Sequence, residues 1–171
     1  MLTSTKLVLG GAASGKSAFA ETLVQPGKRV YLATAQAFDD EMRAKIATHI
    51  ARRGPEWRTI ECPLTLPEQI AQLESSQIAL IDCVTLWLSN VMLAEHDVTD
   101  AQDQLFEAMR TCAAPLVIVS NEVGQGIVPQ TKLGRTFREA QGRLNIRLAQ
   151  HSDCVVHVVA GLPNILKGHL T

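Results

Sequence analysis

A glycine-rich segment at residues 7–21, LVLGGAASGKSAFAE, has the residue types and spacing of a phosphate-binding loop. Gly10, four further residues and then Gly15-Lys16-Ser17 fit the P-loop pattern in full, between an apolar strand and a helix-forming run. In such a loop the backbone N–H groups point at one anion, the lysine faces the β- and γ-phosphates, and the serine hydroxyl binds Mg²⁺. A glycine-rich turn capping an ordinary helix is the alternative, and it leaves Lys-Ser directly after glycine unexplained.

The elements that must position this loop alternate along the chain. Four further short runs rich in Val, Ile and Leu are typical of strands buried on both faces of a parallel sheet. They lie at 29–35, 78–82, 115–120 and 154–160. Helical patterns lie at 17–23, 39–53, 67–74, 86–94, 99–112 and 132–150. We therefore predict an α/β fold, three-layered and P-loop NTPase-like, with a mainly parallel sheet in a single domain over residues 1–171.

Residues that follow the strands of such a sheet are candidates for ligand binding, because ligands bind at the carboxyl ends of parallel strands. Asp82 ends an apolar run, where P-loop proteins place the acid that orients Mg²⁺. The alternative is an aspartate that caps the following helix, and the two roles are compatible. After the strand at 115–120, Gly124 and Gly126 either let the backbone approach a ligand or form a flexible turn.

One histidine lies on the helix predicted at 39–53, which has acids in its first turn and bases in its last. His49 falls beside the apolar stripe of that helix, and Arg52, Arg53 and Arg58 follow closely. A packed or half-exposed side chain is the ordinary interpretation of such a histidine. Neighbouring arginines also suit a second role, since they keep an imidazole neutral and nucleophilic and neutralise a nucleotide's phosphates during attack. Attack on an α-phosphate would form a covalent phosphoramidate.

Composition excludes several other classes of protein. The 171 residues carry a formal net charge of −1, so no basic field favours a nucleic-acid partner. No apolar run approaches the ~20 residues of a transmembrane helix, and with strand and P-loop patterns from the first residues on we expect no signal peptide. The widely spaced cysteines and the histidines show no metal-ligand spacing, which argues against zinc. We expect a cytoplasmic protein with reduced thiols.

Beyond these patterns, the chain as a whole resembles the bifunctional adenosylcobinamide kinase/adenosylcobinamide-phosphate guanylyltransferase family of cobalamin biosynthesis. The resemblance covers nearly all residues, runs in family order, and is most specific in the block at 31–63. The matching segments are GGAASGKS, YLATAQAFDDEMRAKIATHIARRGPEWRTIECP, IDCVTLWLSNVM and VIVSNEVGQGIVPQTKLGRTFREAQGRLNIRLAQ. It implies a P-loop enzyme that uses Mg²⁺ with ATP or GTP, forms a homotrimer, and acts on adenosylcobinamide and its phosphate.

The resemblance also implies a role for individual residues. His49 matches the histidine that becomes guanylylated, and Lys16 matches the phosphate-loop lysine. Glu61 and Asp82 match acidic positions associated with the bound nucleotide, and Ser17 and Asp82 are the expected Mg²⁺ ligands. The other nucleotide contacts that it implies are Gly10, Gly11, Ala12, Ala13, Ser14, Gly15, Ala33, Thr34, Ala35, Ile50, Ala51, Arg52 and Arg53.

The chain departs from the family pattern at three places. Many members carry arginine at the position of Ala13, some carry a second histidine beside the one at His49, and the C-terminal AGLPNILKGHL matches more loosely. The implied reaction phosphorylates the aminopropanol hydroxyl of adenosylcobinamide and then transfers GMP from GTP to that phosphate, releasing pyrophosphate. Asp82 and Glu122 are both candidate bases for the hydroxyl.

On the helix at 132–150, one side carries Lys132, Arg135, Arg138, Arg143 and Arg147, and the other carries Leu133, Phe137, Ala140, Leu144 and Leu148. A solvated face over a packed face is the plain interpretation, and arginines that face a corrinoid phosphate or a neighbouring subunit are the alternative. Two rival functions also remain. One is a small-molecule kinase with a structural His49, and the other is a regulatory GTPase or ATPase switch, although the chain lacks an Asn-Lys-x-Asp motif.

Overall fold

The computed structural model describes residues 4–24, 27–36 and 54–170. The helix predicted at 39–53, with His49, lies outside the described residues. The strands are β1 (Thr5–Gly10), β2 (Lys28–Ala33), β3 (Trp57–Glu61), β4 (Gln77–Asp82), β5 (Leu116–Asn121), β6 (Cys154–Val159) and β7 (Leu162–Lys167). The helices are α1 (Lys16–Thr22), α3 (Leu66–Ala71), α4 (Val84–Leu93), α5 (Val98–Thr111) and α6 (Lys132–His151).

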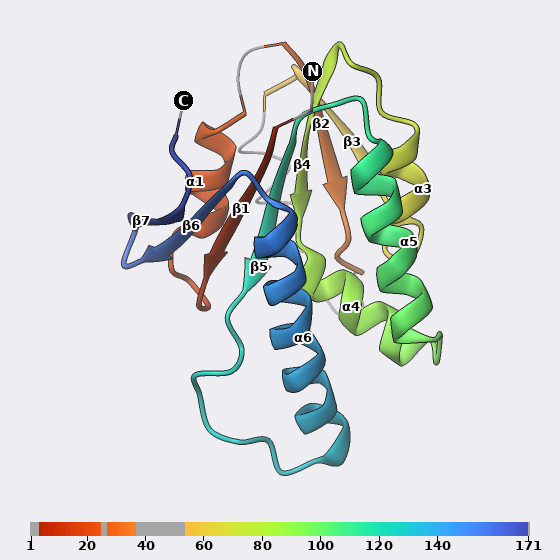
Figure 1. Ribbon diagram of the computed structural model, residues 1–171, viewed down its shortest axis with the longest axis vertical. Coiled ribbons are helices and arrows are strands. Elements are labelled where there is room, and N and C mark those ends of the chain that lie inside the picture. Colours follow the sequence, from red (N-terminus) through yellow and green to blue (C-terminus); the bar gives the residue numbers. More distant parts are fainter. Residues whose placement is uncertain (1–3, 25–26, 37–53, 171) are drawn as a thin grey trace.

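The strands form one sheet in the order β3-β2-β4-β5-β1-β6-β7. Neighbours from β3 to β6 pair in parallel, and β7 alone among the described strands pairs antiparallel, with β6. The prediction of an α/β fold with a mainly parallel sheet is therefore confirmed. In Figure 1 the arrowheads of β1, β2, β4 and β5 point to the same lower edge, toward which α4 and the start of α6 also lie.

Two strands were not predicted, and both lie at an edge of the sheet. The segment of β3 reads WRTIE, in which no residue is fully buried, so it lacks the apolar run of a central strand. Every residue of β7 is exposed, and it follows β6 through a turn in which Ala160 and Gly161 have positive φ. Edge strands need no continuous hydrophobic pattern, which explains both omissions.

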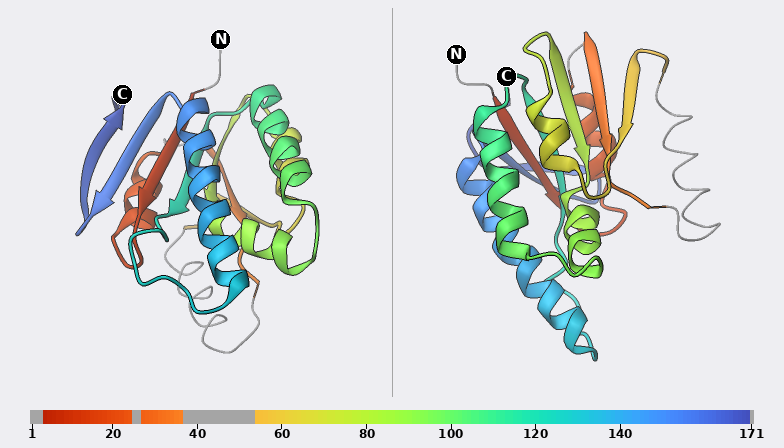
Figure 2. Two further views of the ribbon diagram at one scale, coloured as in Figure 1. Left: turned by 60° about the horizontal axis from the view of Figure 1, so that its bottom comes forward. Right: turned by 90° about the vertical axis from the view of Figure 1, so that its right-hand side faces the viewer.

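Helices cover the two faces of the sheet and make three layers (Figure 2). On one face Leu7, Ile118 and Ile81 pack with Trp87 of α4, together with buried residues of α3, α5 and α6. On the other face Val8, Val117 and Leu80 pack with Ala20 of α1. The alternation of Leu7 and Val8 between the two clusters explains why the central strands read as continuous apolar runs. Among the described helices, none is long and apolar enough to cross a bilayer.

Candidate active site

The glycine-rich segment forms a turn at the carboxyl end of β1. The backbone is left-handed at Ala13 (φ 53°) and at Gly15 (φ 90°), and the Ser14 N–H donates to the Gly11 carbonyl at 3.3 Å. Helix α1 begins at Lys16 directly after Gly15, and no side chain caps it. The N–H groups of a helix start have no carbonyl partner within the helix, so this uncapped turn is built to receive an anion.

The turn between β6 and β7 supports the loop from outside. The Gly161 N–H donates to the Ser14 carbonyl at 2.8 Å. A Cβ added to Gly15 would lie 3.1 Å from the Gly161 Cα, and one added to Gly10 would lie 2.8 Å from the Val158 carbonyl oxygen. Both P-loop glycines are therefore required by close backbone approach, and Gly15 also by its positive φ. The sequence pattern alone did not show that the turn between the buried strand β6 and the exposed strand β7 has this role.

Two polar groups of the loop are placed for a ligand. The Ser14 hydroxyl is buried and has no hydrogen-bond partner among the described residues. The Lys16 ammonium donates to the Gly11 carbonyl at 3.0 Å, so it lies across the loop. Buried hydroxyls are nearly always paired in folded proteins, and an anion held in the loop would supply the missing acceptor.

Gly15→Ala is expected to destabilise the protein. An alanine at Gly15 must adopt a left-handed backbone, which costs about 1–2 kcal/mol for an L-residue, and its Cβ must push against Gly161. Because the melting temperature of a domain this size shifts by about 2–4 °C per kcal/mol, calorimetry should record a decrease of several degrees. Gly11→Ala is the matched control, since a Cβ at Gly11 meets nothing within 4 Å. Equal melting temperatures for the two variants would contradict this account of the loop.

A second group of predicted residues lies at the carboxyl ends of neighbouring strands. By register Ala33 of β2 is paired with Glu61 of β3 on one side and with Asp82 of β4 on the other. The Tyr31 hydroxyl donates to Asp82 Oδ2 at 2.8 Å. Helix α4 begins at Val84, and its N-cap residue Cys83 makes no side-chain capping hydrogen bond. The Asp82 carboxylate is thus held by Tyr31 and does not cap the helix, and its role as a Mg²⁺ ligand stays a prediction.

The donors on this face suit Mg²⁺. Asp82 packs on the same face of the sheet as α1, since its partner Tyr31 belongs to the cluster that includes Ala20. Ser17 lies in the first turn of α1. Mg²⁺ prefers oxygen ligands and is usually bound by one or two protein groups together with substrate phosphates, so a hydroxyl and a carboxylate beside a phosphate loop fit it. No cluster of three or more His, Cys, Asp or Glu able to hold a metal occurs among the described residues.

Thr34, a predicted nucleotide contact, has its side chain buried and fully engaged. Its hydroxyl donates to the Cys83 carbonyl at 2.7 Å and accepts from the Cys83 N–H at 2.9 Å. Asn90 of α4 in turn donates to the Thr34 carbonyl at 2.8 Å and to the Pro63 carbonyl at 3.0 Å. These bonds fix the segments after β2, β3 and β4 to one another. The Thr34 N–H also donates to the Asp82 carbonyl at 3.4 Å, so both the side chain and the backbone of Thr34 join these segments.

Neither Tyr31 nor Asn90 was identified from the sequence. Tyr31 lies two residues before Ala33 and therefore on the same face of β2. The two-residue period of a strand could thus have predicted that Tyr31 faces the site. Asn90 interrupts the apolar run of α4 and is 6% exposed. A buried amide must be hydrogen-bonded, and a polar residue within such a run could have been recognised on that ground.

The Cys83 thiol lies between the charged groups of the site. Burial, and then the Asp82 carboxylate, raise its pKa from 9.0 to about 11, and the nearby Lys16 ammonium acts in the opposite direction. Burial likewise raises the pKa of Cys62 to about 12 and also raises the pKa of Cys112 and of Cys154. All four cysteines are buried. Cys83 is therefore a neutral packing group at physiological pH and no nucleophile.

This pKa predicts slow thiol labelling of the native protein. With a pKa of about 11, about one Cys83 thiol in a thousand is ionised near pH 8, against about one in ten at the unshifted value. The thiolate is the reactive form, so labelling by a disulfide reagent should be slow in the native protein and should accelerate as the pH rises. All four thiols should react at once in denaturant. Rapid labelling of native Cys83 near pH 8 would contradict this assignment.

The arginines of α6 are not simply solvated. Arg138 donates to the carbonyls of Gly124 and Gly126, and Arg135 donates to those of Pro129 and Gln130. These two arginines fix the connection between β5 and α6 to the helix, so the segment of Gly124 and Gly126 is a tethered turn and not a flexible one.

Two further predictions for α6 need correction. Arg147 Nη2 lies 2.7 Å from Asp103 Oδ1, and Arg147 Cζ lies 4.2 Å from the ring centre of Phe106. The Arg147 side chain therefore packs on α5. Leu133, predicted on the packed face, is 55% exposed. Leu133 lies in the first turn of the helix, beyond the sheet that buries Leu144 and Leu148. The 3.6-residue periodicity indicates which face packs but not how far along the helix the core extends.

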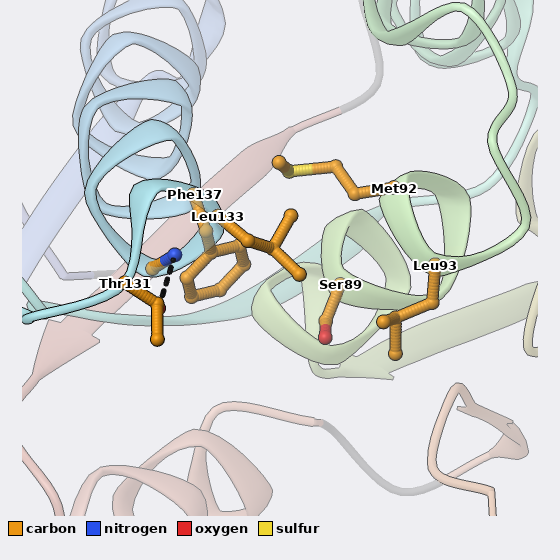
Figure 3. A pocket seen from close by; sticks show the side chains of 7 residues that line it. Ser89, Met92, Leu93, Thr131, Leu133 and Phe137 are labelled. Atoms are coloured by element: carbon orange, nitrogen blue, oxygen red, sulfur yellow. Dashed lines mark hydrogen bonds between the residues drawn. The ribbon is translucent and has the colours of Figure 1, made fainter.

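An apolar pocket opens beside that exposed turn, between α4 and α6 (Figure 3). It is lined by Ser89, Met92, Leu93, Thr131, Leu133, Gly134 and Phe137. Thr131 caps α6 at this point by accepting from the Gly134 N–H at 3.1 Å. None of the described residues in its wall is charged, so the pocket suits an apolar group and not a phosphate.

The structure thus brings most of the predicted site to one edge of the sheet. Gly10–Ser17, Ala33–Ala35, Glu61 and Asp82 all lie at carboxyl ends of strands or directly after them. His49, Ile50, Ala51, Arg52 and Arg53 lie outside the described residues.

Comparison with known proteins identifies the family. Residues 6–166 match the family described as cobinamide kinase / cobinamide phosphate guanyltransferase. The chain belongs to this family. A bifunctional adenosylcobalamin biosynthesis protein CobP of Pseudomonas aeruginosa is 42% identical over 167 residues, covering 95% of this chain and 96% of the relative. The CobU proteins of Salmonella typhimurium and Escherichia coli are 40% and 39% identical, each covering 91% of this chain and 96% of the relative.

A solved structure agrees on the fold alone. A KaiC-like protein of Pyrococcus horikoshii OT3 superposes with a TM-score of 0.52 at 11% identity, covering 90% of this chain and 70% of the other. As a member of the cobinamide kinase / cobinamide phosphate guanyltransferase family, the chain is a transferase of phosphorus-containing groups, and the predicted family and enzyme class are confirmed.

Proposed function

We propose that this protein phosphorylates the aminopropanol hydroxyl of adenosylcobinamide with ATP or GTP, and then transfers GMP from GTP to that phosphate. The products would be adenosyl-GDP-cobinamide and pyrophosphate, in the biosynthesis of adenosylcobalamin. The observation that carries the proposal is the phosphate loop at Gly10–Ser17, with its left-handed turn, its orphaned Ser14 hydroxyl and its lysine, in a chain of this family.

In the kinase half, the P-loop holds the triphosphate. The loop amides and Lys16 stabilise negative charge on the transferring γ-phosphoryl group, and this kind of catalysis is mostly positioning and electrostatics. Ser17 and Asp82 would hold Mg²⁺, which would neutralise charge on the phosphates. The Tyr31 hydroxyl restrains the Asp82 carboxylate through its 2.8 Å hydrogen bond.

In the guanylyl half, His49 attacks the α-phosphate of GTP, a phosphorus–nitrogen bond forms, and pyrophosphate leaves. The phosphate of the corrinoid then takes GMP from the histidine. Residues Ile50–Arg53 and Glu61 contact the guanine nucleotide. The resemblance described above supports these roles, and the place of Glu61 at the carboxyl edge of the sheet, beside Ala33, is compatible with them.

Both reactions belong, in this proposal, to one domain that works as a cytoplasmic homotrimer. The four cysteines are buried thiols, which suits a reducing compartment. The trimer rests on the family resemblance.

Labelled GTP distinguishes this function from that of a kinase with a structural histidine. The protein is incubated with Mg²⁺ and GTP labelled at the α-phosphate, then denatured and treated with acid or alkali. A phosphoramidate predicts protein-bound label that survives alkali and is lost in acid, located by peptide mapping at His49. A protein that carries no label would support the kinase alone, and label elsewhere in the chain would refute His49 as the nucleophile.

A further inference from the structure

A group of buried polar side chains joins α4, β5 and α6 beside the phosphate loop. Thr85 of α4 is 5% exposed, Ser120 of β5 and Gln141 of α6 are each 0% exposed, and Asn145 of α6 is 7% exposed. Burying polar groups costs free energy unless they are hydrogen-bonded, and a network of this size needs an account. None of these four residues has a part in the function proposed above.

Asn145 is the centre of the network and uses its whole hydrogen-bonding capacity. Its Oδ1 accepts from the Ser120 hydroxyl at 2.6 Å and from the Gln141 amide at 2.9 Å. Its Nδ2 donates to the Asn121 carbonyl and to Glu122 Oε1, both at 3.1 Å. A backbone carbonyl only accepts, so the amide can lie only this way round, with an N–H directed at the Glu122 carboxylate.

Glu122 lies between the phosphate loop, which follows β1, and Asp82, which ends β4. It directly follows β5, which lies between β1, the strand of the phosphate loop, and β4, the strand of Asp82. The Glu122 N–H donates to the Gly10 carbonyl at 3.1 Å, so its backbone is attached to the first glycine of the loop. The Glu122 side chain is bound by Asn145 of α6.

The structure also separates the two carboxylates that could act as a base. Asp82 Oδ2 is occupied by the Tyr31 hydroxyl, on the face of the sheet that α1 covers. Within the part of the chain that the structure describes, Glu122 Oε1 accepts one side-chain N–H, from Asn145 of α6. Asp82 thereby suits Mg²⁺, and Glu122 is the carboxylate left for a proton.

We propose that Glu122 takes the proton of the substrate alcohol during phosphoryl transfer and that Asn145 is its positioning residue. This inference rests on the proposed kinase function. As the alcohol oxygen forms its bond to the γ-phosphorus, its O–H bond breaks and the proton passes to Glu122. The bond from the γ-phosphorus to the bridging oxygen breaks, and the nucleoside diphosphate leaves with that electron pair.

The test measures phosphorylation of adenosylcobinamide by the full-length protein. Glu122→Gln should lower kcat about 100-fold or more, as is usual for loss of a general base, with KM for the nucleotide within about threefold. Asn145→Asp keeps the shape of the side chain and the acceptor for Ser120, but it removes the N–H groups that reach Glu122 and the Asn121 carbonyl. It should lower kcat about 10- to 100-fold at similar KM.

A double variant separates positioning from general damage. If Asn145 acts only through Glu122, then Glu122→Gln with Asn145→Asp should be no slower than Glu122→Gln alone. Gln141→Met is the matched control. Gln141 lies one turn away on α6 and donates to Asn145 Oδ1, not to Glu122, so this variant should keep kcat within about threefold. If Asn145→Asp does not fold, Asn145→Ser removes the same donor and takes its place in the cycle.

Three results would overturn the inference: kcat of Glu122→Gln within about threefold of the wild type, additive losses in the double variant, or an equal loss in Gln141→Met. Labelling by α-labelled GTP does not use this base and should stay normal in every variant. Should the wild-type protein itself leave adenosylcobinamide unphosphorylated, the proposed function fails as well, so the two failures are distinguishable.

Discussion

Replacing Lys16 with alanine should abolish the kinase reaction. Lys16 supplies the one full positive charge of the loop, and its ammonium already lies across it at the Gly11 carbonyl. Removing a preorganised group that stabilises transition-state charge commonly costs about 10²- to 10³-fold in rate. We expect phosphorylation of adenosylcobinamide to fall by at least about 100-fold and GTP binding to weaken about 10-fold or more, measured by product formation and by calorimetric titration.

Lys28→Ala provides the matched control for Lys16→Ala. Lys28 is exposed at the amino end of β2, at the opposite edge of the sheet from the loop. It changes the net charge equally and should leave both measurements within about twofold, because an exposed charge so far from the ligand is screened by salt. Full kinase activity in Lys16→Ala, with a normal melting temperature, would remove the loop from the mechanism.

Replacing His49 with alanine should separate the two reactions. The imidazole is the proposed nucleophile toward the α-phosphate, and no covalent GMP can form without it. We expect transfer of GMP to adenosylcobinamide phosphate to be undetectable, while phosphorylation of adenosylcobinamide retains a substantial part of the wild-type rate. Chromatography of the corrinoids after incubation with GTP and Mg²⁺ would show accumulation of the phosphate.

His96→Ala is the control for this variant. His96 is an exposed residue just after the ten-residue helix α4, has no role in the proposed mechanism, and its removal should change neither reaction. Normal formation of the GDP-corrinoid by His49→Ala would rule out the covalent route and would favour direct attack of the corrinoid phosphate on GTP.

The sequence was most informative where a local pattern has one physical solution. The segment from Gly10 to Ser17 predicted a loop after a buried strand, and the structure has that loop with Gly15 left-handed. The continuous apolar runs predicted a parallel sheet, because a strand buried on both faces has no polar side to show. Asp82 was likewise placed at the end of such a run, and it is the last residue of β4.

Features that depend on contacts between distant segments were not predictable in this way. Three hydrogen bonds of the site join residues far apart in the chain. They run from Gly161 to Ser14, from Tyr31 to Asp82 and from Asn145 to Glu122. Periodicity reports only the direction in which a side chain points along its own element. The roles of Arg138 and Arg147 on α6 were misjudged for the same reason, since their partners lie in other segments.

The most direct test of the account is to identify the corrinoid products by mass. Purified protein is incubated with adenosylcobinamide, GTP and Mg²⁺. The corrinoids are then separated at successive times, and their masses are measured by mass spectrometry. The account predicts that a phosphorylated corrinoid appears first and is then converted into one that carries an added GMP, with pyrophosphate released in equal amount. A corrinoid that stays unmodified, or one that is phosphorylated and never gains GMP, would contradict it.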